Sequence, residues 1–346
     1  MGFRTRQIHL VRRSVGIARP TDFTVAEVEL PPLGPGQVLV RNLWMSIDPY
    51  MRRSIEAEAT DLEPWPLHGP LDGPAIGRVV ESRNAAFRPG DLVENMSGWQ
   101  EHFISNGDRY VPYLSPANAL VVRNAPGALP KDYVGLLGIA ALTAWGGMAR
   151  LARVEPGDTV VVSSGAGTVG SIACQIAKIR QARVVSSAGS DDKVRWLLDK
   201  AGVDAAFNYR TTAASVALRE LCPRRIDLVL ENASPEHLSA CLPLMNELKQ
   251  VLIAGFVGTY SSRGNMRIEN FEYALDRFLT LQSYRIMDFL DEYDTFVRDM
   301  LSWRSEGRMH LEETVYDGLE TAPTALCALF TGGRIGKTLV RLATDS

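Results

Sequence analysis

The sequence has few of the features that mark several large classes of protein. Its four cysteines are scattered and form no CxxC pair, so neither a disulfide framework nor a zinc ribbon is indicated. The longest uncharged apolar stretch, residues 134–148, is interrupted by glycines and too short to span a bilayer, and no hydrophobic leader follows Met1. We therefore expect a cytoplasmic protein with no membrane partner.

The sequence also has no large excess of charge and no clustered metal ligands. A net charge of −3 on 346 residues gives no general attraction to nucleic acid, so a small molecule is the expected partner. No GxSxG segment is present, which disfavours hydrolysis. The histidines lie apart from one another and from the cysteines, which argues against a catalytic metal. They are His9, His68, His102, His237 and His310.

The length exceeds what one hydrophobic core usually supports, so we expect two domains. Short β-like runs separated by Pro/Gly turns fill the chain up to about residue 125. From residue 158 strands and helices alternate, which predicts a parallel sheet with right-handed crossovers. The expected strands are 159–163, 183–187, 226–230 and 250–254, and the expected helices are 167–180, 190–201, 235–245 and 287–306. Two later β-like runs, 314–316 and 337–341, are expected to return to the first domain.

A glycine-rich turn joins the first of these strands to its helix. It reads Gly165-Ala166-Gly167-Thr168-Val169-Gly170 and follows the β-branched run 159–162. Such a turn gives a dinucleotide a tight bend, a backbone that the pyrophosphate can approach, and a helix N-terminus for its negative charge. Glycine-rich turns of this kind also occur purely for packing. The setting between strand and helix favours dinucleotide binding.

The end of the second strand bears on the choice of dinucleotide. NAD enzymes place an acidic residue there, whereas NADP enzymes place small or basic residues. Residues 183–187 run into Ala188-Gly189-Ser190 without an acid, and Asp191 and Asp192 follow a good N-cap, where they complement the helix dipole. Lys193 could reach a 2′-phosphate, although a lysine on a helix can equally be only solvated. NADP(H) is favoured over NAD(H).

Several segments, in order along nearly the whole chain, resemble motifs of the zinc-independent medium-chain reductases. This family includes prostaglandin reductases, plant alkenal double-bond reductases and bacterial curcumin reductases. Residues 46–52 resemble S-x-D-P-Y-M-R, 97–100 S-G-W-Q, 142–145 L-T-A-Y, 165–178 G-x-V-G-S…Q-I-A-K, 188–193 A-G-S-D-E-K, 207–210 F-N-Y-K, and 336–337 the closing G-K. The resemblance implies an α/β protein with a β-rich, GroES-like substrate domain formed by residues 1–125 and 312–346. It also implies a doubly wound, parallel-sheet (Rossmann) NADPH-binding domain at 126–311.

The resemblance also implies the residues of the site. Gly189, Lys193 and Tyr209 would hold the 2′-phosphate of NADPH. Tyr260 would lie near the nicotinamide, and Tyr50 matches a tyrosine of the substrate pocket, which makes these two the catalytic candidates. The remaining cofactor contacts would be Gly165, Gly167, Thr168, Val169, Gly170, Asn232 and Arg334. No metal ligand is expected.

Two departures from the family pattern stand out. The family's D-N-V-G-G is here Glu231-Asn232-Ala233-Ser234-Pro235, and Arg334 replaces the asparagine of its G-x-N-x-G-K. A fixed cation at Arg334 could bind an anionic group of the substrate or could point to solvent. The pocket is therefore expected to differ from that of typical enal reductases.

The expected reaction is NADPH-dependent reduction of the C=C bond of an α,β-unsaturated aldehyde or ketone. Hydride adds to the β-carbon, and a hydrogen-bond donor stabilises the charge on the carbonyl oxygen. The candidate donors are the Tyr260 hydroxyl and a ribose hydroxyl of the cofactor, although Tyr260 could be an ordinary wall residue. Two alternatives stay open: a quinone or carbonyl reductase, and a non-catalytic NADPH-binding protein. A homodimer formed through an edge strand of the nucleotide domain is expected.

Overall fold

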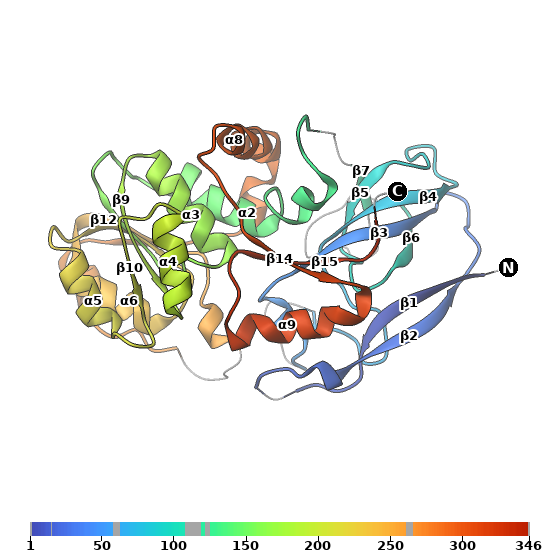
Figure 1. Ribbon diagram of the computed structural model, residues 1–346, viewed down its shortest axis with the longest axis horizontal. Coiled ribbons are helices and arrows are strands. Elements are labelled where there is room, and N and C mark those ends of the chain that lie inside the picture. The colour runs from blue at the N-terminus through green and yellow to red at the C-terminus, as the bar shows by residue number, and fades with distance from the viewer. Residues whose placement is uncertain are drawn as a thin grey trace. The chain divides into compact units, whose positions relative to one another are not determined.

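The computed structural model describes residues 2–14, 16–57, 63–107, 119–121 (backbone only), 125–260 and 266–344. The chain divides into two compact units, residues 1–138 with 313–346, and residues 139–312 (Figure 1). The sequence predicts the first boundary at residue 125. It lies at Gly138, because the short helix η2 (Pro130–Val134) packs against strands of the first unit.

The second unit contains a parallel sheet of six strands in the order β10-β9-β8-β11-β12-β13. These strands are β8 (Thr159–Val162), β9 (Arg183–Ala188), β10 (Ala205–Asn208), β11 (Ile226–Glu231), β12 (Met245–Ile253) and β13 (Thr280–Ser283). The strand order reverses between β8 and β11. In open α/β sheets, ligands bind beyond the carboxyl ends of the strands at such a reversal.

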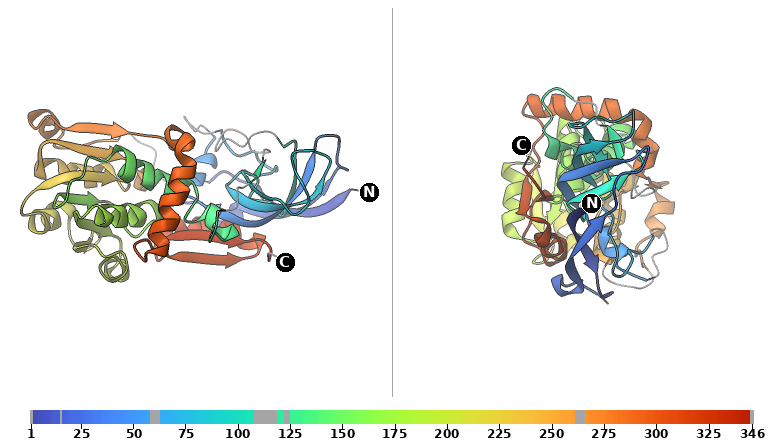
Figure 2. Two further views of the ribbon diagram at one scale, coloured as in Figure 1. Left: turned by 90° about the horizontal axis from the view of Figure 1, so that it is seen from above. Right: turned by 90° about the vertical axis from the view of Figure 1, so that its right-hand side faces the viewer.

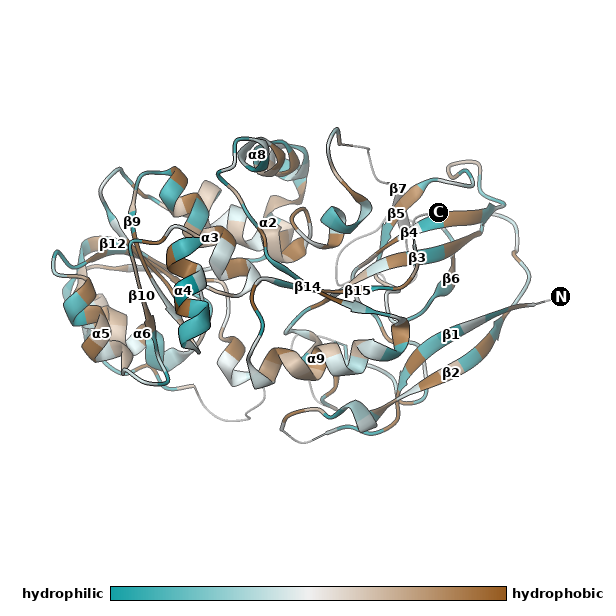
Figure 3. Cartoon of the chain, viewed as in Figure 1, coloured by the Kyte–Doolittle hydropathy of each residue, from teal (hydrophilic) through white to brown (hydrophobic). Residues whose placement is uncertain are grey.

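Helices connect these strands and complete the second unit. They are α2 (Ile139–Trp145), the π-helical turn η3 (Gly146–Leu151), α3 (Thr168–Ile179), α4 (Asp191–Asp199), α5 (Ala214–Leu221), α6 (Pro235–Cys241), α7 (Glu272–Asp276), η6 (Ile286–Glu292) and α8 (Tyr293–Ser305). Two short 3-10 turns, η4 (Leu242–Leu244) and η5 (Val257–Thr259), complete the set. The central strands meet in a core around Val161, Val185, Val229 and Val251, all fully buried. Figure 3 shows hydrophilic residues over much of α4, as its exposed face requires.

The first unit is built on a mostly antiparallel sheet in the order β14-β15-β3-β4-β5-β7, with β6 also paired to β3. Its strands are β3 (Val38–Ile47), β4 (Ala75–Ser82), β5 (Leu92–Asn95), β6 (His102–Ser105), β7 (Ala119–Val121), β14 (Glu313–Asp317) and β15 (Lys337–Arg341). The pair β1 (Phe3–Leu10) and β2 (Phe23–Leu30) forms a separate ribbon. Because β15 pairs with β3, the C-terminal segment returns to the first unit, as predicted (Figure 2).

Aromatic side chains form the centre of the first unit's core. Trp99 lies 5.2 Å from Trp65 and 5.8 Å from Phe23, between ring centroids. The largely apolar helix α9 (Ala322–Thr331) packs on the same cluster, and Tyr50 and Tyr316 border it. Short helices η1 (Pro20–Asp22), α1 (Met51–Ser54) and η7 (Leu319–Thr321) complete this unit. Within the described residues, none of the helices combines the length and apolarity that crossing a bilayer requires.

Candidate functional site

The glycine-rich turn leads from β8 into α3, and two of its glycines are required by packing. A Cβ at Gly165 would lie 1.9 Å from Ser186 Oγ, and one at Gly170 would lie 2.4 Å from the Ser164 carbonyl oxygen. Ser164 itself adopts a φ of 51°, which a non-glycine residue rarely does. Neighbouring protein atoms thus explain glycine at two of the three positions.

Gly167, the middle glycine, differs from the other two. A Cβ there would meet its nearest neighbour, the Ser164 carbonyl oxygen, at 3.4 Å, which is ordinary contact. Gly167 is the N-cap of α3, offers no side-chain cap, and is followed by Thr168, Val169 and Gly170 without an acidic residue in the first turn. Protein packing does not require glycine here, so its absent side chain fits a ligand approaching the helix N-terminus.

A cluster of basic and phenolic groups lies where β9 ends. A Cβ at Gly189 would lie 2.7 Å from Tyr209 Oη and 3.4 Å from Arg210 Nε, so both groups converge over this glycine. Burial, and next the charge of Arg210, lower the pKa of Lys193. Within the described residues neither Lys193 nor Arg210 has a carboxylate partner. Two neighbouring cations without a counter-ion fit a dianionic group such as a 2′-phosphate.

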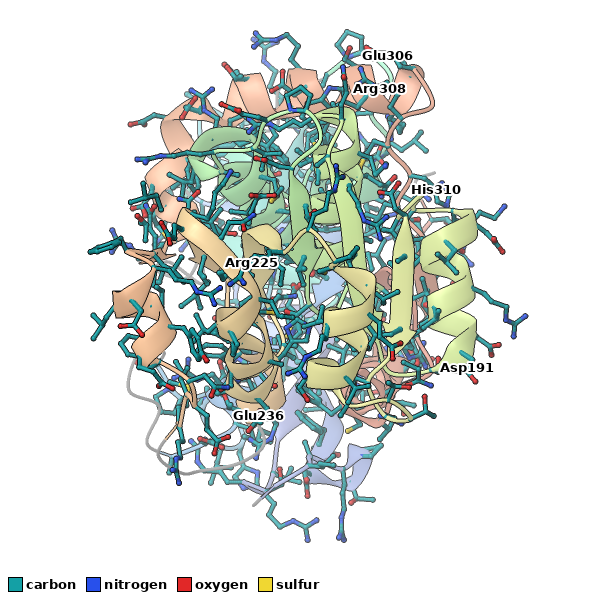
Figure 4. All side chains as sticks on the ribbon, turned by 90° about the vertical axis from the view of Figure 1, so that its left-hand side faces the viewer. Asp191, Arg225, Glu236, Glu306, Arg308 and His310 are labelled. Atoms are coloured by element: carbon teal, nitrogen blue, oxygen red, sulfur yellow. The ribbon has the colours of Figure 1, made fainter. Side chains whose placement is uncertain are left out.

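The two aspartates that follow this strand are engaged elsewhere. Asp191 Oδ1 accepts a hydrogen bond of 2.8 Å from Asn208 Nδ2, and Asp192 pairs with Arg195. Ser190 caps α4, its Oγ accepting a hydrogen bond from the backbone N–H of Lys193. Figure 4 shows Asp191 at the start of that helix. Their place in the first turn agrees with the predicted role of complementing the helix dipole.

A buried carboxylate, Glu231, connects the ends of β8 and β11. Its Oε1 accepts hydrogen bonds from Ser163 Oγ (2.7 Å) and from the backbone N–H groups of Ala233 (2.7 Å) and Ser234 (2.9 Å). Its Oε2 lies 2.8 Å from His237 Nδ1. Glu231 is fully buried, so these groups replace the water that it loses. We name Glu231, Ser163 and His237 the Glu231 hub.

The surroundings of the imidazole in the hub favour its protonated form. Burial alone lowers the pKa of His237, but Cys241 and Glu231 outweigh it and raise this pKa well above its ordinary value. The ring of Phe207 is parallel to the imidazole, with centroids 6.4 Å apart. We therefore treat Glu231 and His237 as an ion pair beneath the reversal point of the sheet.

The hub fixes two segments that carry predicted site residues. The Asn232 backbone N–H donates to Ser163 Oγ at 2.7 Å, and the Gly258 N–H donates to the Ala233 carbonyl at 2.9 Å. A Cβ at Gly255 would lie 3.2 Å from Tyr260 Oη and 4.0 Å from Asn232 Oδ1. The side chains of Tyr260 and Asn232 therefore both approach Gly255.

In the first unit, two of the recognised motifs meet. Lys337 Nζ of the closing G-K lies 2.5 Å from Asp48 Oδ1 and donates to Ser46 Oγ, also at 2.5 Å. Ser46 Oγ in turn donates to Asp48 Oδ2. All three side chains are buried. This triad holds the segment that leads to Tyr50, which immediately precedes α1.

Arg334 lies just before β15 in the first unit and is half-buried. Its guanidinium carbon stands 4.2 Å from the centroid of the Tyr316 ring, and burial lowers its pKa. The sequence left open whether this cation points to solvent. The structure places it against an aromatic face.

Sequence reasoning missed two parts of this arrangement. The resemblance assigns no role to Arg210, although a basic residue beside Tyr209 at a strand end is a usable signal. The Glu231–His237 contact has no signal in the sequence, because it depends on how the loop after β11 folds back on α6.

Three of the cysteines are buried thiols with raised pKa values, and the described parts of the chain contain no cluster of metal ligands. Burial raises the pKa of Cys174 and of Cys222 to about 12 and that of Cys327 to about 11, so these thiols stay protonated at neutral pH. Among the described residues, no three His, Cys, Asp or Glu side chains are grouped so as to hold a metal ion.

Comparison with known proteins adds family information. Residues 6–112 match the family model described as the N-terminal domain of oxidoreductase, and residues 168–302 match the model described as zinc-binding dehydrogenase. The chain is 35% identical to prostaglandin reductase 1 of Bos taurus, covering 96% of this chain and 97% of that protein. It is 32% identical to the NADPH-dependent curcumin reductase of Escherichia coli, covering 99% and 98%. The crystal structure of CurA with NADPH from Vibrio vulnificus aligns at a TM-score of 0.89 and 28% identity, covering 98% and 100%.

Proposed function

Because this chain belongs to the zinc-independent medium-chain reductases, the family of prostaglandin, curcumin and 2-alkenal reductases, we propose that it reduces activated C=C bonds with NADPH. The substrates are α,β-unsaturated aldehydes or ketones, and hydride goes to the β-carbon. The observation that carries the proposal is the pair of uncompensated cations, Lys193 and Arg210, at the strand end beside the glycine-rich turn.

The residues of the second unit divide the task of holding the cofactor. Gly189, Lys193 and Tyr209, with Arg210, bind the 2′-phosphate. The open backbone of Gly167 and the first turn of α3, Thr168 to Gly170, bind the diphosphate, and Gly165 permits the turn. Asn232 contacts the nicotinamide end.

The bound NADPH supplies the hydride. As charge develops on the carbonyl oxygen of the substrate, the Tyr260 hydroxyl donates a hydrogen bond to it. The hydroxyl is kept in place by the segment 254–260, which the Glu231 hub and Ala233 anchor. Tyr50 is assigned to the wall of the substrate pocket, where the buried triad of Ser46, Asp48 and Lys337 fixes its segment.

The function is tested by measuring NADPH oxidation with enals, enones, nitroalkenes and quinones, and repeating the measurement with NADH. We expect turnover with enals or enones, and a strong preference for NADPH. Turnover restricted to quinones, or tight NADPH binding without any turnover, would reject the proposal.

Replacing Gly167 by alanine tests the diphosphate site. The added methyl fits the protein but occupies the face that the diphosphate approaches, so we expect the Kd for NADPH to rise about tenfold or more, a loss of ~1.4 kcal/mol. Thermal unfolding should stay close to that of the wild type. The matched Gly170→Ala variant should instead lose stability, because its methyl meets backbone atoms. Unchanged NADPH affinity in Gly167→Ala would remove this residue from the site.

Replacing Tyr260 by phenylalanine tests the oxyanion donor. Loss of one such donor typically costs about 3–4 kcal/mol, so kcat with an enone should fall about 100-fold or more, while NADPH still binds. Tyr273→Phe is the matched control, since that ring lies on α7 and stacks with Arg277, the residue that follows this helix. Full turnover in Tyr260→Phe would show that this hydroxyl takes no part.

We also propose a cytoplasmic homodimer. All four cysteines are unpaired and buried, which suits a reducing compartment. Strand β13 is at the edge of the parallel sheet and could pair with its copy. A monomer mass in sedimentation equilibrium would contradict the homodimer. Secretion of the protein into an oxidising compartment would contradict the cytoplasmic location.

A further inference from the structure

Backbone hydrogen bonds tie the turn that follows β11 to the turn that follows β12. The carbonyl oxygen of Glu231, at the end of β11, accepts hydrogen bonds from the N–H groups of Ala254 (2.9 Å) and Gly255 (3.4 Å). The carbonyl oxygen of Ala233 accepts one from the N–H of Gly258 at 2.9 Å. Because the two turns are joined at three points, a shift of the first turn displaces the second.

The side-chain carboxylate of Glu231 arranges the first of these turns. Its Oε1 accepts hydrogen bonds from Ser163 Oγ and from the backbone N–H groups of Ala233 and Ser234. Ser163 Oγ in turn accepts a hydrogen bond of 2.7 Å from the N–H of Asn232. Three consecutive backbone N–H groups therefore depend on the orientation of one carboxylate, two of them directly and one through a hydroxyl.

His237 holds the other oxygen of this carboxylate. Its Nδ1 lies 2.8 Å from Glu231 Oε2, and both side chains are buried. The backbone N–H of His237 also donates to Ser234 Oγ, at 3.3 Å, so the first turn of α6 is joined to the same segment. A hydrogen bond to an ionised carboxylate is stronger than one between neutral groups. With Oε2 held by His237, Oε1 stays directed at the donors of the turn.

Packing alone does not account for an imidazole at this position. The Nε2 of His237 is buried and has no hydrogen-bond partner within the described residues. A buried polar atom without a partner costs stability, and an apolar side chain of similar size would avoid this cost. The parallel arrangement with the Phe207 ring could be made by any flat apolar ring. What such a ring could not supply is the N–H that faces Glu231.

We propose that His237 is a positioning residue for the nicotinamide half of NADPH and that it acts through Glu231. By orienting this carboxylate, it sets the turn that carries Asn232 and, through the three backbone bonds, the segment that carries Tyr260. This inference rests on the proposed function, in which both residues serve that end of the site. The adenosine half is assigned to Gly189 and its neighbours after β9, two strands from β11 in the sheet. The two halves of the cofactor should therefore respond differently to a change at His237.

The test compares two ligands that share the adenosine half of the cofactor. NADP⁺ contains the nicotinamide half and adenosine 2′,5′-bisphosphate lacks it, so the ratio of the Kd for NADP⁺ to the Kd for the bisphosphate isolates that half. Calorimetry gives both Kd values and the fraction of protein that binds, so unfolded chains are not counted. In His237→Leu we expect the ratio to rise about tenfold, as loss of a hydrogen bond to a charged group predicts. An equal rise of both Kd values would assign His237 a general structural role and overturn the proposal.

Two further variants separate positioning from a general effect on the fold. His237→Asn keeps an N–H donor attached to Cγ, as Nδ1 is, so its ratio should return toward the wild-type value although the ring is lost. His310→Leu is the matched control, because that imidazole pairs with Glu312 at 3.2 Å and is exposed on the same unit (Figure 4). Its ratio should equal that of the wild type. A ratio in His237→Asn as high as in His237→Leu would show that the contact with Glu231 plays no part.

Ser163→Ala keeps the test decisive if His237→Leu does not fold. This change breaks the same path closer to Asn232, so the ratio should rise here too, and an unchanged ratio would overturn the proposal. The binding ratios are measured without an alkene. Absence of turnover with every alkene would therefore reject the proposed function alone. An unchanged ratio in His237→Leu, with a wild type that reduces enones, would reject the positioning role alone.

Discussion

Replacing Lys193 and Arg210 together by alanine is expected to raise the Kd for NADPH by about 100-fold or more, while NADH binding stays nearly unchanged. Arg210 Nε lies near Gly189, and the charge of Arg210 acts on Lys193. In the described residues neither cation has a carboxylate partner. A hydrogen bond to a charged group contributes about 1.5–3 kcal/mol, which corresponds to about 10- to 100-fold per cation. Fluorescence titration with both nucleotides measures the change in preference.

A second double variant separates this specific effect from a general loss of positive charge. Arg195 and Lys200 also lie on or just after α4, and Arg195 is paired with Asp192. Their joint replacement by alanine removes the same net charge from the same region and should leave the preference for NADPH intact. A similar loss in both double variants would mean that no defined 2′-phosphate site exists here. The single variants Lys193→Ala and Arg210→Ala show how much of the change in the Kd for NADPH comes from each cation.

Replacing Glu231 by alanine is expected to have the largest effect on stability. The change leaves the Ser163 hydroxyl, two backbone N–H groups and the His237 imidazole without their buried acceptor. Breaking a buried charge pair by removing one partner typically costs about 3–5 kcal/mol in the free energy of unfolding. Urea denaturation should show this loss. Asp227→Ala, which removes a less buried acceptor of the same unit, should cost less.

Comparison of the wild type with Glu231→Gln measures how the contribution of the hub to the free energy of unfolding depends on pH. Because the folded-state pKa of His237 is raised, the pair contributes its full stability below about pH 6.5, the ordinary value, and loses it as the pH rises toward the folded-state pKa. The free energy of unfolding of the wild type relative to Glu231→Gln should therefore decline as the pH is raised above that value. A difference that grew with pH would contradict the charged pair.

The sequence was sufficient for the alternating unit because its central strands are distinctive. Strand β8 is Thr-Val-Val-Val and β11 contains the apolar run Leu-Val-Leu, and each is followed by a helix. The predicted fold class is confirmed. The short elements β10, α5 and β13 were not predicted. Strand β10 is Ala-Ala-Phe-Asn and β13 is Thr-Leu-Gln-Ser, and each contains only one large apolar residue and no β-branched apolar residue. Their strand form depends on pairing with β9 and β12.

The site was only partly accessible from the sequence for a different reason. The glycine-rich turn and the strand-end residues are local, so their spacing could be interpreted directly. The partners of Asp48 and of Glu231 are not local in this sense. Lys337 is 289 positions from Asp48, and Ser163 is 68 from Glu231, and only the folded sheets bring them together. The stacking of Arg334 on Tyr316 likewise requires β14 and β15 to pair.

The fate of the transferred hydrogen tests the central claim most directly. The enzyme would be supplied with an acyclic enone and NADPH deuterated at C4 on the transferred face, and the product would be analysed by mass spectrometry and NMR. The account predicts a saturated ketone with one deuterium on the former β-carbon. An allylic alcohol with deuterium on the carbinol carbon, or oxidation of NADPH with the alkene left intact, would contradict it.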